Sequence, residues 1–289
     1  MELIFIRWNI NPEIFRIGGF ALRYYSVLFA IAFILGYLLV KRMYQKEGRS
    51  LELLHPLFIY LIAGTLIGAR LGQVLFYEFD YFKQHPLQII LPFQISSKGF
   101  EWTGYQGLAS HGGAIGVLVA LALYCRKYHQ PFLSVLDKVV IAVALAGFFI
   151  RTGNLFNSEI LGKPSDVPWA FVFERVDLLP RHPSQLYEAI AYFFIFLVLW
   201  GWYQRKGTQL KTGFLFGLFL VLVFSARFLI EFSKEAQEAF ERTLPLNMGQ
   251  ILSLPFIMVG AYFLVRKHKV KTNISNHLNE VYHGTQRQS

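Results

Sequence analysis

Long apolar runs, separated by short polar segments, recur along the whole chain. Seven of them approach the roughly 20 residues that a helix needs to cross the hydrocarbon core of a bilayer. The pattern predicts an all-α integral membrane protein with about seven transmembrane helices, formed by a single polytopic domain over residues 1–271. The runs cover residues 22–40, 56–77, 106–125, 135–150, 187–204, 213–231 and 249–265.

Lysine and arginine are concentrated in every second loop between the apolar runs. Membrane proteins accumulate these residues in their cytoplasmic loops, so we expect an external N-terminus, a cytoplasmic C-terminus and a small external cap at residues 151–186. The distribution also indicates that the basic residues behind the formal net charge of +10 set the membrane topology, so we expect no nucleic-acid partner. The clusters are Lys41, Arg42, Lys46 and Arg49; Arg126, Lys127 and Lys138; Arg205, Lys206 and Lys211; and Arg266, Lys267, Lys269 and Lys271.

The composition favours a membrane protein over a soluble one. Hydrophobic residues make up 54% of the chain and charged residues 16%, whereas charged residues are about 25% of a typical globular domain. The one cysteine, Cys125, excludes an intramolecular disulfide, and we interpret it as a small apolar residue at a helix end. The first run lacks a small-residue cleavage site, so we expect it to be an uncleaved anchor.

Three segments are predicted to lie outside the bilayer. Residues 1–20 are too short and polar to span it, and Trp8 and Phe15 indicate an arm at the outer interface. Within the cap, the apolar residues from Trp169 to Phe173 are expected to form a strand. Residues 272–289 are polar, and we expect a disordered cytoplasmic tail.

Small residues recur at four-residue spacing in several of the runs. Such stripes allow helices to approach closely in lipid, where burial of apolar surface gives no gain on association. Close helix packing is therefore the first interpretation, and a groove that admits a lipid chain is the alternative. The stripes are Gly64, Gly68 and Gly72; Gly112 and Gly116; and Gly213 and Gly217.

Three arginines fall in the predicted external halves of the spans. A charged side chain at the bilayer centre costs at least about 2.5 kcal/mol, so Arg70, Arg151 and Arg227 are candidates for function. Internal pairing is the alternative, with Glu231 for Arg227 and with Glu78 or an outer carbonyl for Arg70. Guanidinium groups match phosphate geometry. The arginines therefore predict an anionic lipid headgroup as ligand.

The end of the fourth run is unusually polar. Its glycines permit non-helical backbone, and polar backbone of that kind at membrane depth normally lines a cavity. We therefore expect a cavity wall at this point rather than a simple turn. The residues concerned are Arg151, Gly153, Asn154, Asn157, Glu159 and Gly162.

Two further polar motifs flank the predicted spans. His111 lies beside paired glycines at the outer start of the third run, where it is either a hydrogen-bonded interfacial residue or part of a site. The segment 181–188, RHPSQLYE, contains His182 and Gln185 and opens the fifth run. Its Pro183 also fits the first turn of a helix without any chemistry.

Several signatures of other chemistries are missing from the sequence. No cluster has the spacing of metal ligands, and neither a nucleophile elbow nor a phosphate-binding P-loop occurs. We therefore expect no metal, no cofactor and no covalent enzyme intermediate.

Five of these blocks, taken in order, resemble the prolipoprotein diacylglyceryl transferase family. The likeness extends from the Tyr24-Tyr25 pair to residues 249–253, GQILS. Some positions depart from the family: Leu155 replaces a common Phe, Val223 replaces a Tyr of some members, and 233–237 lacks a frequent proline. The five blocks are GARLG at 68–72, SHGG at 110–113, the segment 151–162, RHPSQLYE at 181–188 and RFLIEF at 227–232.

The resemblance implies a lipid transfer reaction. The diacylglyceryl group of phosphatidylglycerol passes to the lipobox cysteine thiol of a prolipoprotein signal peptide, which gives a thioether and releases glycerol phosphate. This is the first step of bacterial lipoprotein maturation. It implies a multi-pass protein of the bacterial cytoplasmic (inner) membrane with its site toward the outer face, and phosphatidylglycerol and prolipoproteins as partners.

On this resemblance we assign roles to individual residues. Arg151, aided by Asn154 and Arg70, is expected to bind the phosphate of phosphatidylglycerol. Arg227 is expected to be a second phosphate ligand, oriented by Glu231. The residues expected to shape the site are Gly153, Asn157, Glu159, Gly162, His182 and Gln185, with Glu159 also holding an arginine.

The catalytic residues are expected to be His111, Arg227 and Tyr25. His111 is the favoured general base for the thiol, whose ordinary pKa is about 8.5. The alternative is that His111 positions the headgroup while Arg227 lowers the pKa of the thiol. Tyr25 is expected to donate a hydrogen bond to the headgroup.

Two other classes of function remain open on the residues alone. A lipid flippase or transporter would use the same arginines as a headgroup pathway, but it would need polar residues across the whole bilayer. The predicted cytoplasmic halves of the spans are apolar. A structural scaffold would leave the polar density at 151–162 unexplained.

Overall fold

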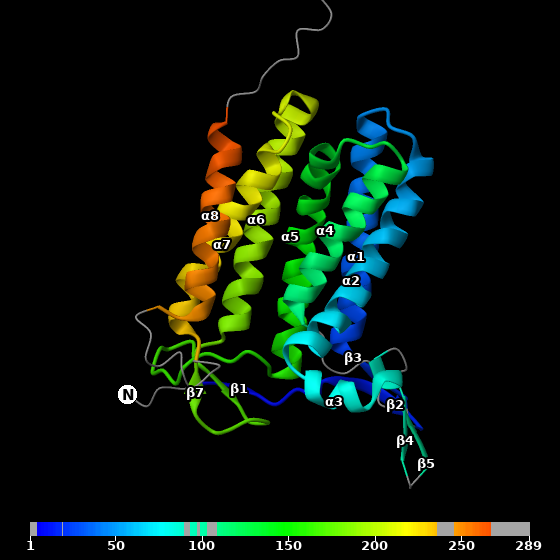
Figure 1. Ribbon diagram of the computed structural model, residues 1–289. Coiled ribbons are helices and arrows are strands. Elements are labelled where there is room, and N and C mark those ends of the chain that lie inside the picture. Colours follow the sequence, from blue (N-terminus) through cyan, green and yellow to red (C-terminus); the bar gives the residue numbers. More distant parts are fainter. Residues whose placement is uncertain are drawn as a thin grey trace, which may run out of the picture.

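The computed structural model describes residues 5–18, 20–89, 93–96, 99–102, 109–235 and 246–266. Within these residues, seven long helices lie side by side in one bundle (Figure 1). All of them except α4 are long and apolar enough to cross a membrane. The all-α membrane fold predicted from the apolar runs is confirmed. The helices are α1 (Tyr24–Lys46), α2 (Leu54–Phe76), α4 (Ser110–Lys127), α5 (Phe132–Asn157), α6 (Ser184–Lys206), α7 (Phe214–Ile230) and α8 (Met248–Val265).

Helix α5 is longer than the apolar run that predicted it. It continues past residue 150 to Asn157, so the expectation of non-helical backbone from Arg151 onward is wrong. The residue that follows the helix, Ser158, adopts the left-handed conformation with φ of 54°. A helical glycine costs about 1 kcal/mol relative to alanine. At Gly153 the missing Cβ gives room to the ring of Tyr25, a packing gain that local sequence does not reveal.

Helix α4 begins with polar residues and ends with basic ones, which explains why it is less apolar than its neighbours. It starts at Ser110, and residues 106–108 of its predicted run lie outside the described residues. The helix nevertheless packs along α2 within the bundle (Figure 1).

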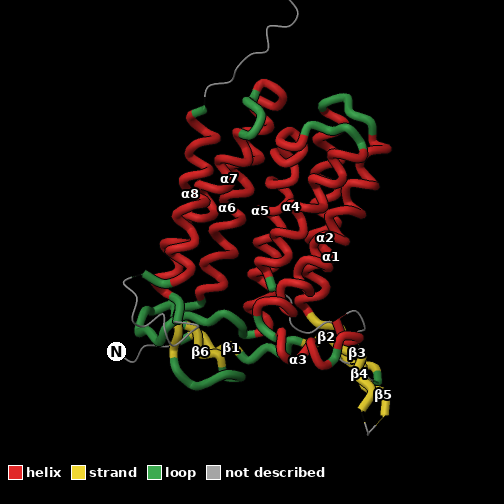
Figure 2. The backbone as a smooth tube through the Cα atoms, in the orientation of Figure 1, coloured by secondary structure: helices red, strands yellow, loops and turns green. Residues whose placement is uncertain are grey.

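One end of the bundle carries the strands and the short helix α3 (Phe79–Gln84) (Figure 2). We call it the strand end. Strand β1 (Ile6–Trp8) pairs in parallel with β6 (Phe171–Phe173), and β6 pairs antiparallel with β7 (Pro180–Arg181). The strand expected near Trp169–Phe173 is confirmed, and the N-terminal arm supplies its neighbour. Two hairpins complete this end, β2 (Glu13–Ile17) with β3 (Phe20–Arg23) and β4 (Phe93–Ser96) with β5 (Gly99–Trp102), together with the 3-10 turn η2 (Pro86–Ile89).

The opposite end, called here the basic end, is where α1, α4, α6 and α8 finish (Figure 1). The 3-10 turns η1 (Leu51–Leu53) and η3 (Gly207–Gln209) lie in its loops. The predicted tail at 272–289 falls outside the described residues. The described members of the basic clusters gather at this end, namely Lys41, Arg42, Lys46, Arg49, Arg126, Lys127, Lys138, Arg205, Lys206, Lys211 and Arg266.

Charges at the basic end are paired with one another. The Glu47 carboxylate lies 3.0 Å from Nζ of Lys138 and 2.8 Å from Nε of Arg49. Asp137 accepts hydrogen bonds of 2.6 and 2.8 Å from backbone N–H groups at the start of α7.

Toward the strand end, the charged cluster of the basic end is followed by an apolar core. Its fully buried side chains include Met43, Leu54, Leu57, Leu121, Ile141 and Leu199.

The glycine stripes bring helix backbones into contact. A Cβ at Gly72 would lie 2.7 Å from Cα of Gly112, and a Cβ at Gly116 would collide with the carbonyl oxygen of Gly64. A Cβ at Gly217 would lie 2.9 Å from the carbonyl oxygen of Gly260 in α8. The interpretation of the stripes as close helix packing is confirmed.

Substitution Gly116→Val should therefore destabilise the fold. The new side chain meets backbone rather than a movable side chain, so α2 and α4 must separate, and we expect a loss of about 2 kcal/mol or more. Thermal unfolding in detergent measures it. Gly201→Ala on α6 is the control, because a Cβ there meets nothing within 4 Å. Equal melting temperatures for the two variants would contradict the packing account.

Candidate functional site

Polar side chains from five helices meet at the strand end of the bundle. Arg151 of α5 forms an ion pair with Glu188 of α6, and the Tyr25 hydroxyl of α1 lies within range of the Arg151 charge. Arg227 of α7 lies within range of His111, which is exposed at the start of α4. The fold thus gathers two of the three arginines with the histidine and tyrosine from the sequence analysis.

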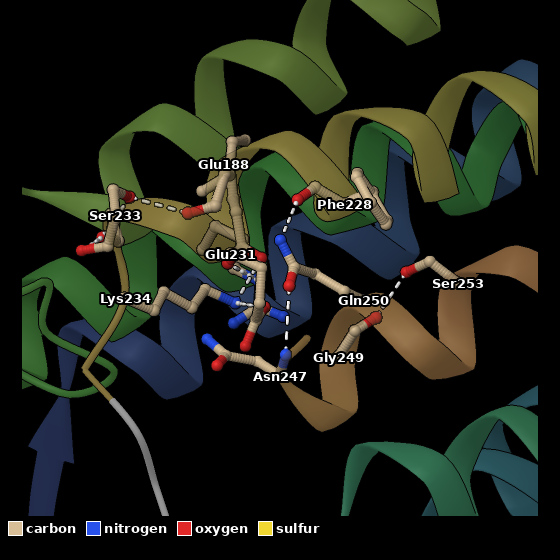
Figure 3. A network of polar contacts seen from close by, with 12 residues as sticks. Glu188, Phe228, Glu231, Ser233, Lys234, Asn247, Gly249, Gln250 and Ser253 are labelled. Atoms are coloured by element: carbon tan, nitrogen blue, oxygen red, sulfur yellow. Dashed lines mark hydrogen bonds and ion pairs between the residues drawn. The ribbon is translucent and has the colours of Figure 1, made fainter. Parts of the chain in front are cut away.

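A chain of alternating charges forms the centre of this site. The Arg151 Nε lies 2.9 Å from Glu188 Oε2, and Glu188 Oε1 accepts a 2.9 Å hydrogen bond from the Lys234 Nζ. Lys234 also donates a 3.1 Å hydrogen bond to Glu231 Oε2 (Figure 3). The four side chains are only 12%, 0%, 4% and 9% exposed, in that order. Because an isolated buried charge is costly, this alternation is what allows so many charges at one place.

Glu231 does not orient Arg227 as the sequence analysis expected. After Ile230 the chain tightens into the 3-10 turn η4 (Glu231–Ser233), which brings Lys234 to the Glu231 carboxylate. Gly249 at the start of α8 makes room for this arrangement, since a Cβ there would lie 2.6 Å from Cδ of Glu231. The carboxylate is therefore committed to the lysine. The one-turn spacing to Arg227 suggested a pair that the 3-10 turn prevents.

Arg227 has no carboxylate within ion-pair distance among the described residues. Its charge instead acts on the His111 imidazole and on the Tyr192 hydroxyl of α6. The site therefore holds a half-buried guanidinium whose charge is not balanced by the neighbouring carboxylates. Such a group is suited to an anionic ligand.

Two tyrosines flank Arg151, and a glycine admits each of them. A Cβ at Gly147 would lie 2.7 Å from the Tyr192 ring, and a Cβ at Gly153 would lie 2.7 Å from the Tyr25 ring. The charge of the Arg151 guanidinium acts on the Tyr192 hydroxyl.

The end of α5 is closed by Glu159. Its carboxylate accepts hydrogen bonds from the amides of Asn154, at 2.9 Å, and Asn157, at 3.1 Å. The left-handed residue Ser158 turns the chain so that this contact forms. Glu159 was expected to hold an arginine, but within the described part of the chain it holds two amides instead. The sequence could not distinguish an arginine partner from amide partners, because the Glu159 carboxylate needs the same turn of the chain to reach either.

Arg70 is held by the segment that follows α2. It donates hydrogen bonds of 2.6 and 3.1 Å to the carbonyl oxygens of Gln88 and Ile89, and its guanidinium lies 4.7 Å from the centroid of the Phe82 ring. A carbonyl partner was one expectation for this residue, and such a partner is confirmed. These contacts are separate from the Arg151–Glu188–Lys234–Glu231 chain.

The cap covers the site through backbone pairing around Gly162. Its N–H donates to the His182 carbonyl at 3.0 Å, and Gly162 forms an antiparallel bridge with Lys234. A Cβ at Gly162 would also lie 2.6 Å from Oγ of Ser184. The cap thereby fixes the backbone of Lys234.

Side chains hold the outer part of the cap. Arg181 lies between Asp177 and Glu235, and its hydrogen bonds hold the pKa of the Asp177 carboxyl below the ordinary value. The His182 Nδ1 lies 3.1 Å from the Tyr187 hydroxyl. Among the described residues no group of three or more His, Cys, Asp or Glu side chains could hold a metal ion.

Sequence reasoning missed three residues of the site: Glu188, Lys234 and Tyr192. Glu188 and Tyr192 lie on the buried stripe of α6, where a carboxylate among apolar residues was an available signal. Tyr192 was concealed because tyrosine is common in such stripes. Lys234 follows Glu231 at a spacing that permits pairing, but only the 3-10 turn shows that it enters the site.

Comparisons with known proteins identify relatives over almost the whole chain. The family model described as prolipoprotein diacylglyceryl transferase matches residues 12–266. The phosphatidylglycerol–prolipoprotein diacylglyceryl transferase of Bacteroides fragilis is 48% identical over 271 residues, which cover 93% of this chain and 98% of the relative. Its counterpart in Tolumonas auensis is 46% identical over 91% of this chain and 98% of the relative. That of Chloroherpeton thalassium is 44% identical over 92% and 95%.

Substitution Lys234→Met should destabilise the protein strongly. Without the lysine, Glu188 keeps only Arg151 as a partner, and Glu231 has no cation among the described residues. Breaking a buried ion pair in this way costs about 3–5 kcal/mol. The double substitution Lys234→Met with Glu231→Gln should recover part of the loss. Unfolding in detergent measures both variants.

Lys163→Met provides the control for this comparison. Lys163 is exposed, and its backbone N–H donates to Ser233, so it lies beside Lys234 in the cap. Its substitution should leave the melting temperature almost unchanged. Similar stabilities for Lys163→Met and Lys234→Met would contradict the alternating-charge account.

Proposed function

The chain belongs to the prolipoprotein diacylglyceryl transferase family, and from this premise we propose how its polar site carries out the reaction. The protein is a transferase that moves the diacylglyceryl group of phosphatidylglycerol to prolipoproteins, the first step of lipoprotein maturation. It is a multi-pass membrane protein. The observation that carries the mechanism is the pair of guanidiniums at the strand end, of which one is tied to Glu188 and the other has no described carboxylate partner.

We propose that the strand end faces the outside of the bacterial cytoplasmic membrane. The basic clusters at the opposite end support this orientation, because such residues accumulate on the cytoplasmic side. The protein is then a single polytopic domain over residues 1–271, with the loop between α5 and α6 as an external cap and residues 272–289 in the cytoplasm. In this orientation the site opens where both substrates reside.

Arg151 and Arg227 bind the phosphate of phosphatidylglycerol. Glu188 lies at the Nε of Arg151 and therefore does not close the guanidinium as a bidentate carboxylate would. Arg227 adds the charge that the neighbouring carboxylates leave unbalanced. Arg151 is held by Glu188 before the ligand arrives, which favours stabilisation of negative charge on the departing phosphate. Asn154 and Glu159 shape the adjoining wall, and Arg70 supports the segment after α2.

The transfer is a displacement at the carbon of the diacylglyceryl group that is bonded to a phosphate oxygen. The thiol sulfur of the lipobox cysteine forms a bond to this carbon, and the carbon–oxygen bond breaks. The electron pair leaves with the phosphate oxygen as glycerol phosphate. His111 takes the thiol proton as general base, and Tyr25 donates a hydrogen bond to the headgroup. In the alternative, His111 positions the headgroup and Arg227 lowers the pKa of the thiol.

A lipid pathway across the bilayer fits the chain less well. The half of the bundle toward the basic end is filled by large apolar side chains. The charges at that end are paired among themselves, as the Glu47 carboxylate is with Lys138 and Arg49. Among the described residues, polar groups that could bind a headgroup on its way across the bilayer are therefore confined to the strand end.

Arg151→Ala should reduce the transfer rate by at least about a hundredfold, the size expected when one fixed donor to developing charge is lost. The measurement is transfer of labelled diacylglyceryl from phosphatidylglycerol to a lipobox peptide, read as a mass shift. Arg205→Ala at the basic end is the control and should keep wild-type activity. Near wild-type transfer by folded Arg151→Ala would remove the phosphate assignment.

His111→Gln distinguishes the two roles of the histidine. As a general base, His111 makes the wild-type rate fall when acid protonates the imidazole, and its loss should slow transfer about a hundredfold. The variant should also lack the acidic decline in its pH–rate profile. His55→Gln at the basic end is the control. Substantial activity with an unchanged profile in His111→Gln would exclude the base role.

A further inference from the structure

One buried amide at the strand end has no hydrogen-bond partner among the described residues. Gln185 is 0% exposed, and neither its Nε2 nor its Oε1 makes a hydrogen bond. An unsatisfied buried polar group costs free energy, and the large majority of buried side-chain polar atoms in native structures have a hydrogen-bond partner. A residue of this kind therefore requires an explanation.

A second buried glutamine nearby shows the ordinary arrangement. Gln250 is 2% exposed, its Nε2 donates to the Phe228 carbonyl at 3.3 Å, and its Oε1 accepts from the Asn247 N–H at 3.0 Å (Figure 3). Both halves of that amide are satisfied within the chain. Gln185 differs in having neither bond, although it is as deeply buried.

The position of Gln185 relates it to the phosphate site. Gln185, Glu188 and Tyr192 lie on the buried stripe of α6 at spacings of three and four residues, which places them on one face of the helix. Glu188 and Tyr192 both contact Arg151. Gln185 lies one turn nearer the strand end than Glu188.

We propose that the Gln185 amide binds the uncharged glycerol of the phosphatidylglycerol headgroup through its hydroxyls; this rests on the proposed function. An amide offers a donor and an acceptor side by side, and a hydroxyl both donates and accepts. An ester carbonyl would satisfy only the Nε2. The phosphate is taken by the guanidiniums, so the headgroup glycerol is the part of the lipid that matches this amide.

Gln185→Met tests the assignment, because it keeps the shape of the side chain and removes both polar atoms. We expect the KM for phosphatidylglycerol to rise about tenfold with kcat almost unchanged, as for loss of uniform binding. The melting temperature should stay the same or rise, since an unpaired buried amide is replaced by an apolar group. Gln250→Met is the matched control and should lower the melting temperature. An unchanged KM in Gln185→Met, or a lowered melting temperature with normal KM, would overturn the proposal.

A lipid analogue supplies the second arm. Phosphatidylglycerol with both headgroup hydroxyls methylated should bind the wild-type protein about tenfold more weakly, while Gln185→Met should show no further loss. Equal losses in the two proteins, or full affinity of the wild type for the analogue, would overturn the role of Gln185. Absence of transfer from ordinary phosphatidylglycerol by the wild type would instead contradict the proposed function itself.

Discussion

The structure depends on a buried row of alternating charges, Arg151, Glu188, Lys234 and Glu231. Removing such groups from water costs several kcal/mol per ion, which only close and well-placed partners offset. The row therefore fixes α5, α6 and the turn after α7 relative to one another. Both carboxylates are engaged by Arg151 and Lys234, and among the described residues neither pairs with Arg227, whose charge we propose to act on the lipid phosphate.

Glycine is the means by which these groups come together. Around the site, four glycines lie where a Cβ would meet a neighbouring site residue. In a bilayer, where apolar burial gives helices no reason to associate, such close fits carry much of the association. The pairs are Gly147 with Tyr192, Gly153 with Tyr25, Gly162 with Ser184 and Gly249 with Glu231. The glycines thus position the polar residues of the site by leaving room for their side chains.

Much of the architecture could be predicted from the apolar runs and basic clusters, because hydrophobic length and charge act locally along the chain. The features that escaped prediction depend on distant segments. Helix α5 passes through Gly153 because a ring from α1 packs there. Glu231 pairs with Lys234 rather than Arg227 because a 3-10 turn follows α7. Glu188 shows its role only when α6 is placed against Arg151.

The central claim is that Arg151 and Arg227 share one lipid phosphate at the strand end. An experimental structure of the protein with bound phosphatidylglycerol tests this most directly. The account predicts phosphate oxygens within hydrogen-bond distance of both guanidiniums, with the Arg151–Glu188 contact preserved. A phosphate bound away from either arginine, or guanidiniums that face separate crevices, would contradict it.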